Sequence, residues 1–274
     1  MTWRDDILAA LRDDDHRQAA ERALLDLPLR ERAQRIDATL AGALVLLLGD
    51  PSRSRQRAVS ELLQKLVADA PAVEDALRAA LDALDPRLRW GAAYTLGHAH
   101  SPPMARLWPA VREALGREDG DQRWAAAELA CELARHHAAV RDEMIAATAQ
   151  GSPTARRMLL YCLRDLDDPA LGEIAAARLG DDDTGVRLAA LSAAVRARQG
   201  ADETERLAGS MAGMVETDPD PGVRRAAAAA LGKLGATGAR VLETLQRAAG
   251  GDDPGLARAA KKAREHVAAR RREN

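Results

Sequence analysis

The sequence predicts an all-α fold built from stacked pairs of helices, and three observations support this prediction. A short pattern with Asp-Pro, an arginine and an alanine-rich run recurs every 31 to 37 residues, a period typical of helical solenoids. No segment shows the alternation of polar and apolar residues that marks a strand. The 274 residues include no Phe, four Trp and two Tyr, so the core must be made mainly of closely packed Ala, Leu and Val, which favours helices.

The recurring pattern marks the start of one helix in each copy, because Asp accepts hydrogen bonds from free N–H groups at a helix N-terminus and Pro suits the first turn. The clearest copies are "DPRLRWGAAYTLG" from 85, "DGDQRWAAAELAC" from 119, "SPTARRMLLYCLR" from 152, "DTGVRLAALSAAV" from 183 and "DPGVRRAAAAALG" from 220. A weaker copy begins at Asp253 and an earlier one at Asp50. The residues before the copies, such as 71–84, 102–116 and 204–216, predict a partner helix. Each repeat therefore has a first helix and a second helix, and the pattern starts the second.

One stripe of each second helix is predicted to form the core. When the fourth residue of a copy is counted as zero, positions 0, 4 and 8 fall within about 80° of one another around a helix. In the last clear copy these positions hold Val223, Ala227 and Leu231. Gln122 stands at the first of these positions in the copy from 119, so that helix is expected to be rotated or more exposed there.

The pattern D-P-x-V-R-x-A-A-x-x-L-G resembles HEAT repeats, in particular the short HEAT-like repeats of the phycobilisome-lyase type, over residues 50–265. This resemblance implies a right-handed α-solenoid superhelix whose second helices line the concave side. It also implies that the shared arginines form a structural ladder between adjacent repeats, bonded to capping acids and carbonyls. The ladder residues are Arg89, Arg123, Arg156, Arg187 and Arg224.

We expect a single HEAT-like α-solenoid domain over residues 1–274. Residues 1–49 are predicted to form N-terminal capping helices, residues 50–252 the repeats, and residues 253–274 a basic C-terminal capping helix. Terminal repeats need a polar outer face, which the acidic first helix and the basic last helix would supply.

Aromatic and charged residues gather at positions 2, 6 and 9 of three successive copies, which point away from the core stripe. The predicted binding residues are Trp90, Tyr94, Trp124, Glu128, Arg157, Tyr161 and Arg164. Aromatic and Arg side chains clustered on a concave surface are typical of binding hot spots. The alternative is that the Trp and Tyr side chains fill gaps between neighbouring helices.

Histidines near two second-helix ends are the only metal candidates, and no metal or other cofactor is expected. They are His98, His100, His136 and His137. Imidazoles bind metals, but histidine is also favoured at a helix C-terminus by the helix dipole and the free carbonyls. The sequence has no Gly-rich phosphate loop, no Cys-x-x-Cys and no nucleophile elbow, so no catalytic residue is assigned.

The favoured function is a non-enzymatic scaffold that binds a protein or peptide partner in its concave groove. Two alternatives stay open. The phycobilisome-lyase resemblance implies a bilin lyase-isomerase, in which Arg157 and Arg164 would pair with propionates beside Tyr161. The segment "RRMLLYCLRDL" from 156 and the spacing of Trp124 and Glu128 resemble HEAT-like alkylpurine DNA glycosylases. The net charge of −2 disfavours nucleic acid as a partner.

The chain is predicted to be cytoplasmic and not to enter a membrane. Its N-terminus, "MTWRDDILAALRDDDHR", is acidic where a secretory signal peptide is basic. The longest apolar stretch, residues 38–49, is shorter than the roughly 20 residues that span a bilayer, and it is expected to be a buried helix.

Overall fold

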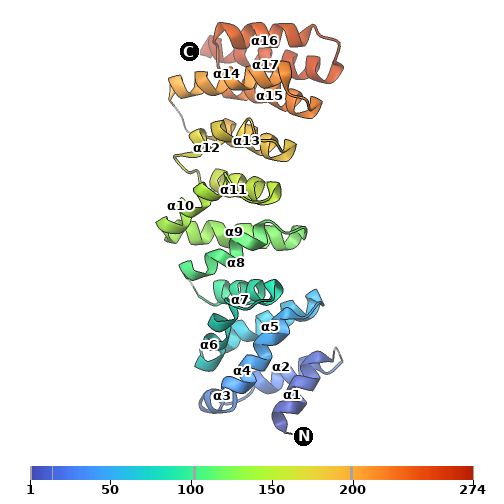
Figure 1. The fold of residues 1–274 in the computed structure, drawn as a ribbon, viewed down its shortest axis with the longest axis vertical. Helices are drawn as coiled ribbons and strands as arrows, with labels where there is room; N and C mark the ends of the chain where they lie inside the picture. The colour runs from blue at the N-terminus through green and yellow to red at the C-terminus, as the bar shows by residue number, and fades with distance from the viewer. Residues whose placement is uncertain (1, 14, 101–102, 198–199, 274) are drawn as a thin grey trace. The chain divides into compact units, whose positions relative to one another are not determined.

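Every regular element in the described part of the chain is a helix, so the all-α prediction is confirmed (Figure 1). The computed structural model describes residues 2–13, 15–100, 103–197 and 200–273, with the side chains of 271–273 left out. No helix among these residues is long and apolar enough to cross a membrane.

The chain divides into two compact units. Unit 1 consists of residues 1–114 and 119–140, and unit 2 of residues 115–118 and 141–274. The predicted single domain, with caps at 1–49 and 253–274, stays a prediction, as does the hand of the superhelix. Each unit is described by itself below.

Unit 1 contains the first three second helices and the N-terminal helices. Its elements are α1 (Trp3–Arg12), α2 (Arg17–Leu25), α3 (Leu29–Arg35), α4 (Ala38–Leu46), η1 (Leu47–Gly49), α5 (Arg53–Leu66), α6 (Pro71–Ala80), α7 (Pro86–Ala99), η2 (Ala105–Leu107), α8 (Trp108–Leu115) and α9 (Gly120–His136). The second helices α5, α7 and α9 contact one another in that order, and α6 packs on α4 and α7. The apolar stretch 38–49 forms α4 and η1, which are largely buried as expected.

Unit 2 has two layers of helices. After α10 (Ala138–Ala147), which crosses the boundary, come α11 (Pro153–Asp165), α12 (Leu171–Arg178), α13 (Thr184–Arg196), α14 (Ala201–Thr217), α15 (Pro221–Leu234), α16 (Ala239–Ala249) and α17 (Pro254–Glu273). The second helices α11, α13, α15 and α17 contact one another in that order, and the first helices α12, α14 and α16 do the same. One layer therefore consists of second helices and the other of first helices.

Each of the five clear copies begins a second helix with a side-chain cap, as predicted. The cap residues accept hydrogen bonds from backbone N–H groups of the first turn. They are Asp85, Asp119, Ser152, Asp183 and Asp220.

The predicted core stripe is confirmed as well. Val223, Ala227 and Leu231 of α15 have no exposed surface, and the corresponding residues of α7 are buried too. Ala155 on α11 is an exception because it is only half-buried, and Gln122 on α9 is half-buried as expected.

Small residues allow the second helices to approach closely. A Cβ atom at Gly232 of α15 would lie 2.6 Å from the Cα atom of Ala263 on α17. In unit 1, a Cβ atom at Gly97 of α7 would lie 2.7 Å from a methyl carbon of Leu129 on α9. These glycines are therefore needed for contact, and not for a turn.

Candidate binding surface

Arg187 shows how a ladder arginine joins two repeats. Its guanidinium donates to both carboxylate oxygens of Asp218, at 2.9 and 3.0 Å, and to the carbonyls of Asp181 and Asp182, at 2.9 and 3.1 Å. The side chains of Arg187 and Asp218 are only 9% and 4% exposed. A bidentate pair of this kind fixes the distance and the orientation of the two repeats.

Arg156 makes the same contacts one repeat earlier. It donates to both carboxylate oxygens of Asp181, at 3.0 and 2.7 Å, and to the carbonyl of Gly151 at 2.8 Å. Burial raises the pKa of the Asp181 carboxyl, but the hydrogen bonds from Arg156 and from the backbone of Asp183 outweigh it, so that this pKa lies below its ordinary value.

The acid in this ladder is not the helix cap itself, which corrects the expectation from the resemblance. Asp181 and Asp218 lie two residues before the caps Asp183 and Asp220, and each accepts the backbone N–H of its cap, at 3.0 and 2.9 Å. One carboxylate therefore binds the arginine of the preceding repeat and also orders the loop that starts the next helix.

The remaining ladder arginines vary. Arg89 donates to Glu113 of the first helix α8, at 3.1 and 2.6 Å, and to two carbonyls ahead of its own helix. Arg224 donates to the carbonyl of Asp218 at 2.8 Å. Arg123 is half-buried near the start of α9.

We call the side of the second helices that carries positions 2, 6 and 9 of each copy the second-helix face. In unit 1 it contains Trp90, Tyr94, Trp124 and Glu128, and in unit 2 it contains Arg157, Tyr161, Arg164 and Leu188. The aromatic ribbon predicted to run from Trp90 to Tyr161 would span both units, and it stays a prediction.

Trp90 was expected to be exposed on this face, and this expectation is wrong, because Trp90 is only 7% exposed. Arg53, the first residue of α5, pairs with Asp119 and Asp121 at the start of α9, at 2.5 and 3.8 Å. Since α5 and α9 are the neighbours of α7, these ion pairs join the two helices that flank α7. The Trp90 ring packs on Tyr94, with ring centroids 5.7 Å apart.

Tyr94 lies between two rings on α7 and is half-buried. Besides Trp90, it contacts His98, with ring centroids 4.1 Å apart and an interplanar angle of 38°. The three rings follow one another at intervals of four residues along the helix, so they form one row on the same side. Only part of Tyr94 is open to a partner.

Trp124 lies at the same position of its copy as Trp90, but it is 57% exposed. Glu128, one turn further along α9, is exposed as well. The two side chains make a neighbouring apolar and acidic pair on the second-helix face of unit 1.

In unit 2, Tyr161 and Arg164 contact each other on α11. The guanidinium carbon of Arg164 lies 5.1 Å from the centroid of the Tyr161 ring, a cation–π contact. Arg164 also pairs with Asp165 at 2.9 Å and donates to the hydroxyl of Ser192 on α13 at 3.3 Å. Much of the hydrogen-bonding capacity of this arginine is therefore used within the protein.

Each of the four histidines faces a carbonyl or a carboxylate of the protein. His98 and His137 contact the carbonyls of Tyr94 and Pro103, at 2.8 and 2.7 Å, and His100 and His136 face the carboxylates of Glu74 and Glu132, at 3.5 and 3.0 Å. The pKa of Glu132 lies below its ordinary value because Arg135 and His136 hydrogen-bond to it. Within the residues that the structure describes, no three His, Cys, Asp or Glu side chains gather as metal ligands would.

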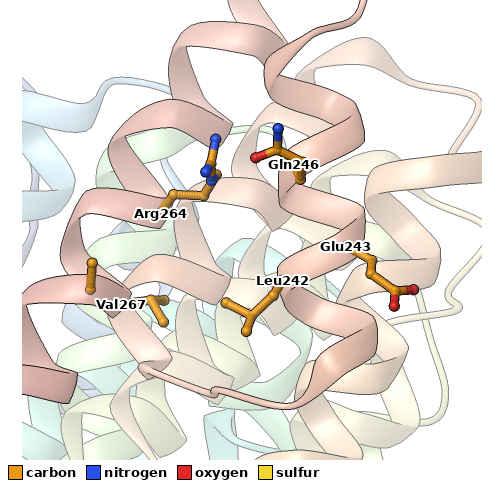
Figure 2. A pocket seen from close by; sticks show the side chains of 6 residues that line it. Leu242, Glu243, Gln246, Arg264 and Val267 are labelled. Atoms are coloured by element: carbon orange, nitrogen blue, oxygen red, sulfur yellow. The ribbon is translucent and has the colours of Figure 1, made fainter.

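Sequence reasoning missed the hollows beside the first helices of unit 2. One hollow of about 420 Å³ lies between α16 and α17, with Leu242 and Val267 at one end and Gln246 and Arg264 at the other (Figure 2). Two more, of about 490 and 610 Å³, adjoin one another between α12 and α14, where both are lined by Ala176 and Ser210. Small residues at the contact between these helices leave this space, and the small side chains along α14 were the available signal.

The comparisons with known proteins concern the fold alone. No protein-family model matches the sequence, and no curated protein matches it. A crystal structure of importin beta aligns with 97% of this chain and 40% of its own, at 15% identity and a TM-score of 0.54. A crystal structure of Kap121p aligns with 96% of this chain and 36% of its own, at 12% identity and a TM-score of 0.50. The chain thus spans less than half the length of either.

The helix pairs, their repeat and these two likenesses define the class of protein. The chain has the HEAT-like α-solenoid fold. Low identity limits this conclusion to the fold, because unrelated functions share this architecture.

Proposed function

We propose that the chain is a non-enzymatic scaffold that binds a protein or peptide partner on its second-helix face. The exposure of Trp124 carries the proposal. Covering a Trp side chain removes a large apolar area from water, and buried Trp is among the residues that contribute most to protein interfaces. The acidic Glu128 beside it would set the polarity of the partner segment that Trp124 contacts. The proposal requires no cofactor, and it keeps the predicted cytoplasmic location.

Neither alternative function is favoured by a specific contact. A bilin would need the ring face of Tyr161 and the guanidinium of Arg164, but these two groups already contact each other, and Arg164 pairs with Asp165. A DNA glycosylase would need Trp124 and Glu128 of unit 1 together with the segment from Arg156, whose first arginine is occupied by Asp181. Arg156 therefore supports the stacking of repeats more than it supports substrate binding.

A peptide selection tests the proposal. The immobilised full chain is screened with a displayed library of random 16-residue peptides, and enriched peptides are synthesised and titrated in solution. We expect Trp124→Ala to weaken binding at least about tenfold, as truncating a hot-spot residue does. The emission of Trp124 should also change as the peptide covers the ring.

The matched control is Leu84→Ala. Leu84 is 97% exposed in the loop before α7, so this variant also removes an exposed apolar side chain from unit 1, but away from α9. Both variants should keep the thermal stability of the parent chain, since exposed residues contribute little to folding. The proposal is wrong if no peptide is enriched, or if Trp124→Ala binds the enriched peptides as well as Leu84→Ala does.

A further inference from the structure

Three of the four second helices of unit 2 carry charge of almost one sign. In residues 153–165, 184–196 and 221–234, which form α11, α13 and α15, Asp165 is the only acidic side chain. The chain as a whole has a formal net charge of −2, so these three helices are much more basic than the chain as a whole.

Several cations of these helices and of α17 lie on the second-helix face or directly beside it, and the exposed Glu265 of α17 is an acidic residue on the same face. We call this set the basic face, and it consists of Arg164, Arg196, Lys233, Arg258 and Lys262. Arg164 is partly exposed and pairs with Asp165, and the other four are exposed. No ion pair or hydrogen bond of their side chains is recorded for those four within the described residues. They are therefore available to an acidic partner.

Arg157 and Arg225 are on the same side of their helices, but they are not part of the basic face, because their side chains pack against the start of the next second helix. A Cβ atom at Gly185 would lie 3.1 Å from a guanidinium nitrogen of Arg157, and one at Gly255 would lie 2.8 Å from the Cδ atom of Arg225. The backbone hydrogen bond from Leu256 is the main cause that holds the pKa of the capping residue Asp253 below its ordinary value, and the charge of Arg225 contributes to the same shift. Arg225 is therefore partly neutralised by the cap of α17.

The spacing of the helices fits an extended peptide. The basic face crosses α11, α13, α15 and α17, each in contact with the next, and packed helices lie about 8–10 Å apart. An extended chain rises about 3.3 Å per residue. One step from helix to helix therefore corresponds to about three residues of a peptide that crosses the layer.

An apolar residue lies within the same surface. Leu188 on α13 is 37% exposed. On the neighbouring helix α15, the small residue Ala229 lies one turn beyond the position that corresponds to Leu188, and it is exposed as well. A phosphate backbone gains nothing from an exposed Leu. A peptide can place an apolar side chain on Leu188 between acidic ones, so the surface favours a peptide over a nucleic acid.

We propose that the basic face of unit 2 binds an extended acidic segment of a protein partner, with carboxylates at every third residue and an apolar residue placed against Leu188. The inference rests on the proposed scaffold function and names the chemistry of one partner segment. Carboxylates of this segment would pair with Arg196, Lys233 and Lys262. The segment would cross the second helices rather than lie along one of them.

The test uses the full chain and a fluorescein-labelled 13-residue peptide with Glu at every third position and Leu and Ser elsewhere. Its affinity is measured by fluorescence anisotropy at low and at physiological salt. We expect saturable binding that weakens as salt rises, because exposed ion pairs are screened. Arg196→Glu combined with Lys233→Glu should weaken binding at least about tenfold. Arg240→Glu, an exposed site on the first helix α16, should change it less than about twofold.

A milder pair guards against misfolding, because an acidic residue near a helix C-terminus opposes the helix dipole. Arg196→Gln combined with Lys233→Gln removes the charges without reversing them and should weaken binding about threefold to tenfold. The same titrations use a 20-nucleotide oligothymidine strand and a 20-base-pair duplex. Stronger binding of either nucleic acid, lost in the same variants, would overturn the acidic-peptide inference.

Two further outcomes separate this inference from the scaffold proposal. If the acidic peptide fails to bind while library-selected peptides still bind through Trp124, the basic-face inference is wrong and the scaffold proposal stands. If neither kind of peptide binds, the scaffold proposal fails first. Binding of the acidic peptide that is unchanged in both charge variants would also overturn the inference, since the basic face would then take no part.

Discussion

Arg187 is nearly buried although arginine is among the residues most often exposed. A buried charge is tolerated only when it is paired and fully hydrogen-bonded. Asp218 supplies the opposite charge, and the carbonyls of Asp181 and Asp182 and the hydroxyl of Thr184 accept the other hydrogen bonds of the guanidinium. The pair therefore fixes the register of two repeats and adds less net stability than the number of its bonds suggests.

We predict that Arg187→Ala lowers the free energy of unfolding by about 3–5 kcal/mol, because it leaves the Asp218 carboxylate buried without its partner. Urea unfolding followed by circular dichroism measures the change. Arg196→Ala on the same helix is the control, and as an exposed site it should change stability by less than about 0.5 kcal/mol. Equal effects of the two variants would contradict a structural role for Arg187.

The exposure of Trp90 and of Trp124 could not be predicted from the residues of a single repeat. Both occupy the same position of their copies, and helical geometry predicts the same environment for both. The structure buries Trp90, which packs on Tyr94, and exposes Trp124. The environment of each ring depends on contacts with other helices, which the repeat pattern does not record, so the candidate site could be predicted only in part.

At the scale of helices, the sequence predicted both where the second helices begin and which of their residues are buried. Each second helix starts at its predicted cap, and the stripes of α7 and α15 are buried. These features depend on residues within a few turns of one another, which a sequence pattern records directly. The hollows between α12 and α14 depend on how two helices from different repeats meet, and the small side chains along α14 do not by themselves locate them.

Glycines on the second helices divide into two kinds, which a matched pair of variants can separate. Gly232→Ala should destabilise the chain by about 1–3 kcal/mol, because the new methyl group would meet the backbone of Ala263 and force α15 and α17 apart. Gly209→Ala, within α14, has no atom within 4 Å of the added carbon and should stabilise by about 0.5–1 kcal/mol. Thermal unfolding of both variants measures the difference. A stabilising Gly232→Ala would mean that this close approach is not needed.

At the scale of the whole molecule, the two units and their repeated helix pairs predict how the chain unfolds. In a repeat protein each repeat contacts mainly its neighbours, so stability is distributed along the chain rather than shared by one core. The core of unit 2 extends from Leu160 to Ala263 and consists of residues from several successive repeats. Local damage should therefore stay local.

Hydrogen exchange followed by mass spectrometry can test this. Arg187→Ala should raise exchange in peptides from α13, α14 and α15, which adjoin the lost ion pair, because local opening there becomes less costly. Peptides from α5 and α7 in unit 1 should exchange as they do in the parent chain. A uniform rise over the whole chain would instead show that the 274 residues unfold as one cooperative body.

The arginines that lie over glycines have a consequence for any attempt to rearrange the chain. Arg157 occupies the space that Gly185 of the next repeat leaves open, and Arg225 does the same at Gly255. Gly222 is the corresponding glycine of the repeat between them, but the repeat before it has Leu188 in place of the arginine. An arginine of one repeat thus requires a glycine in the next repeat, so the repeats are not interchangeable modules. A protein engineer who duplicates, deletes or transplants one repeat would have to move both members of such a pair together, or the junction would carry either a clash or a gap.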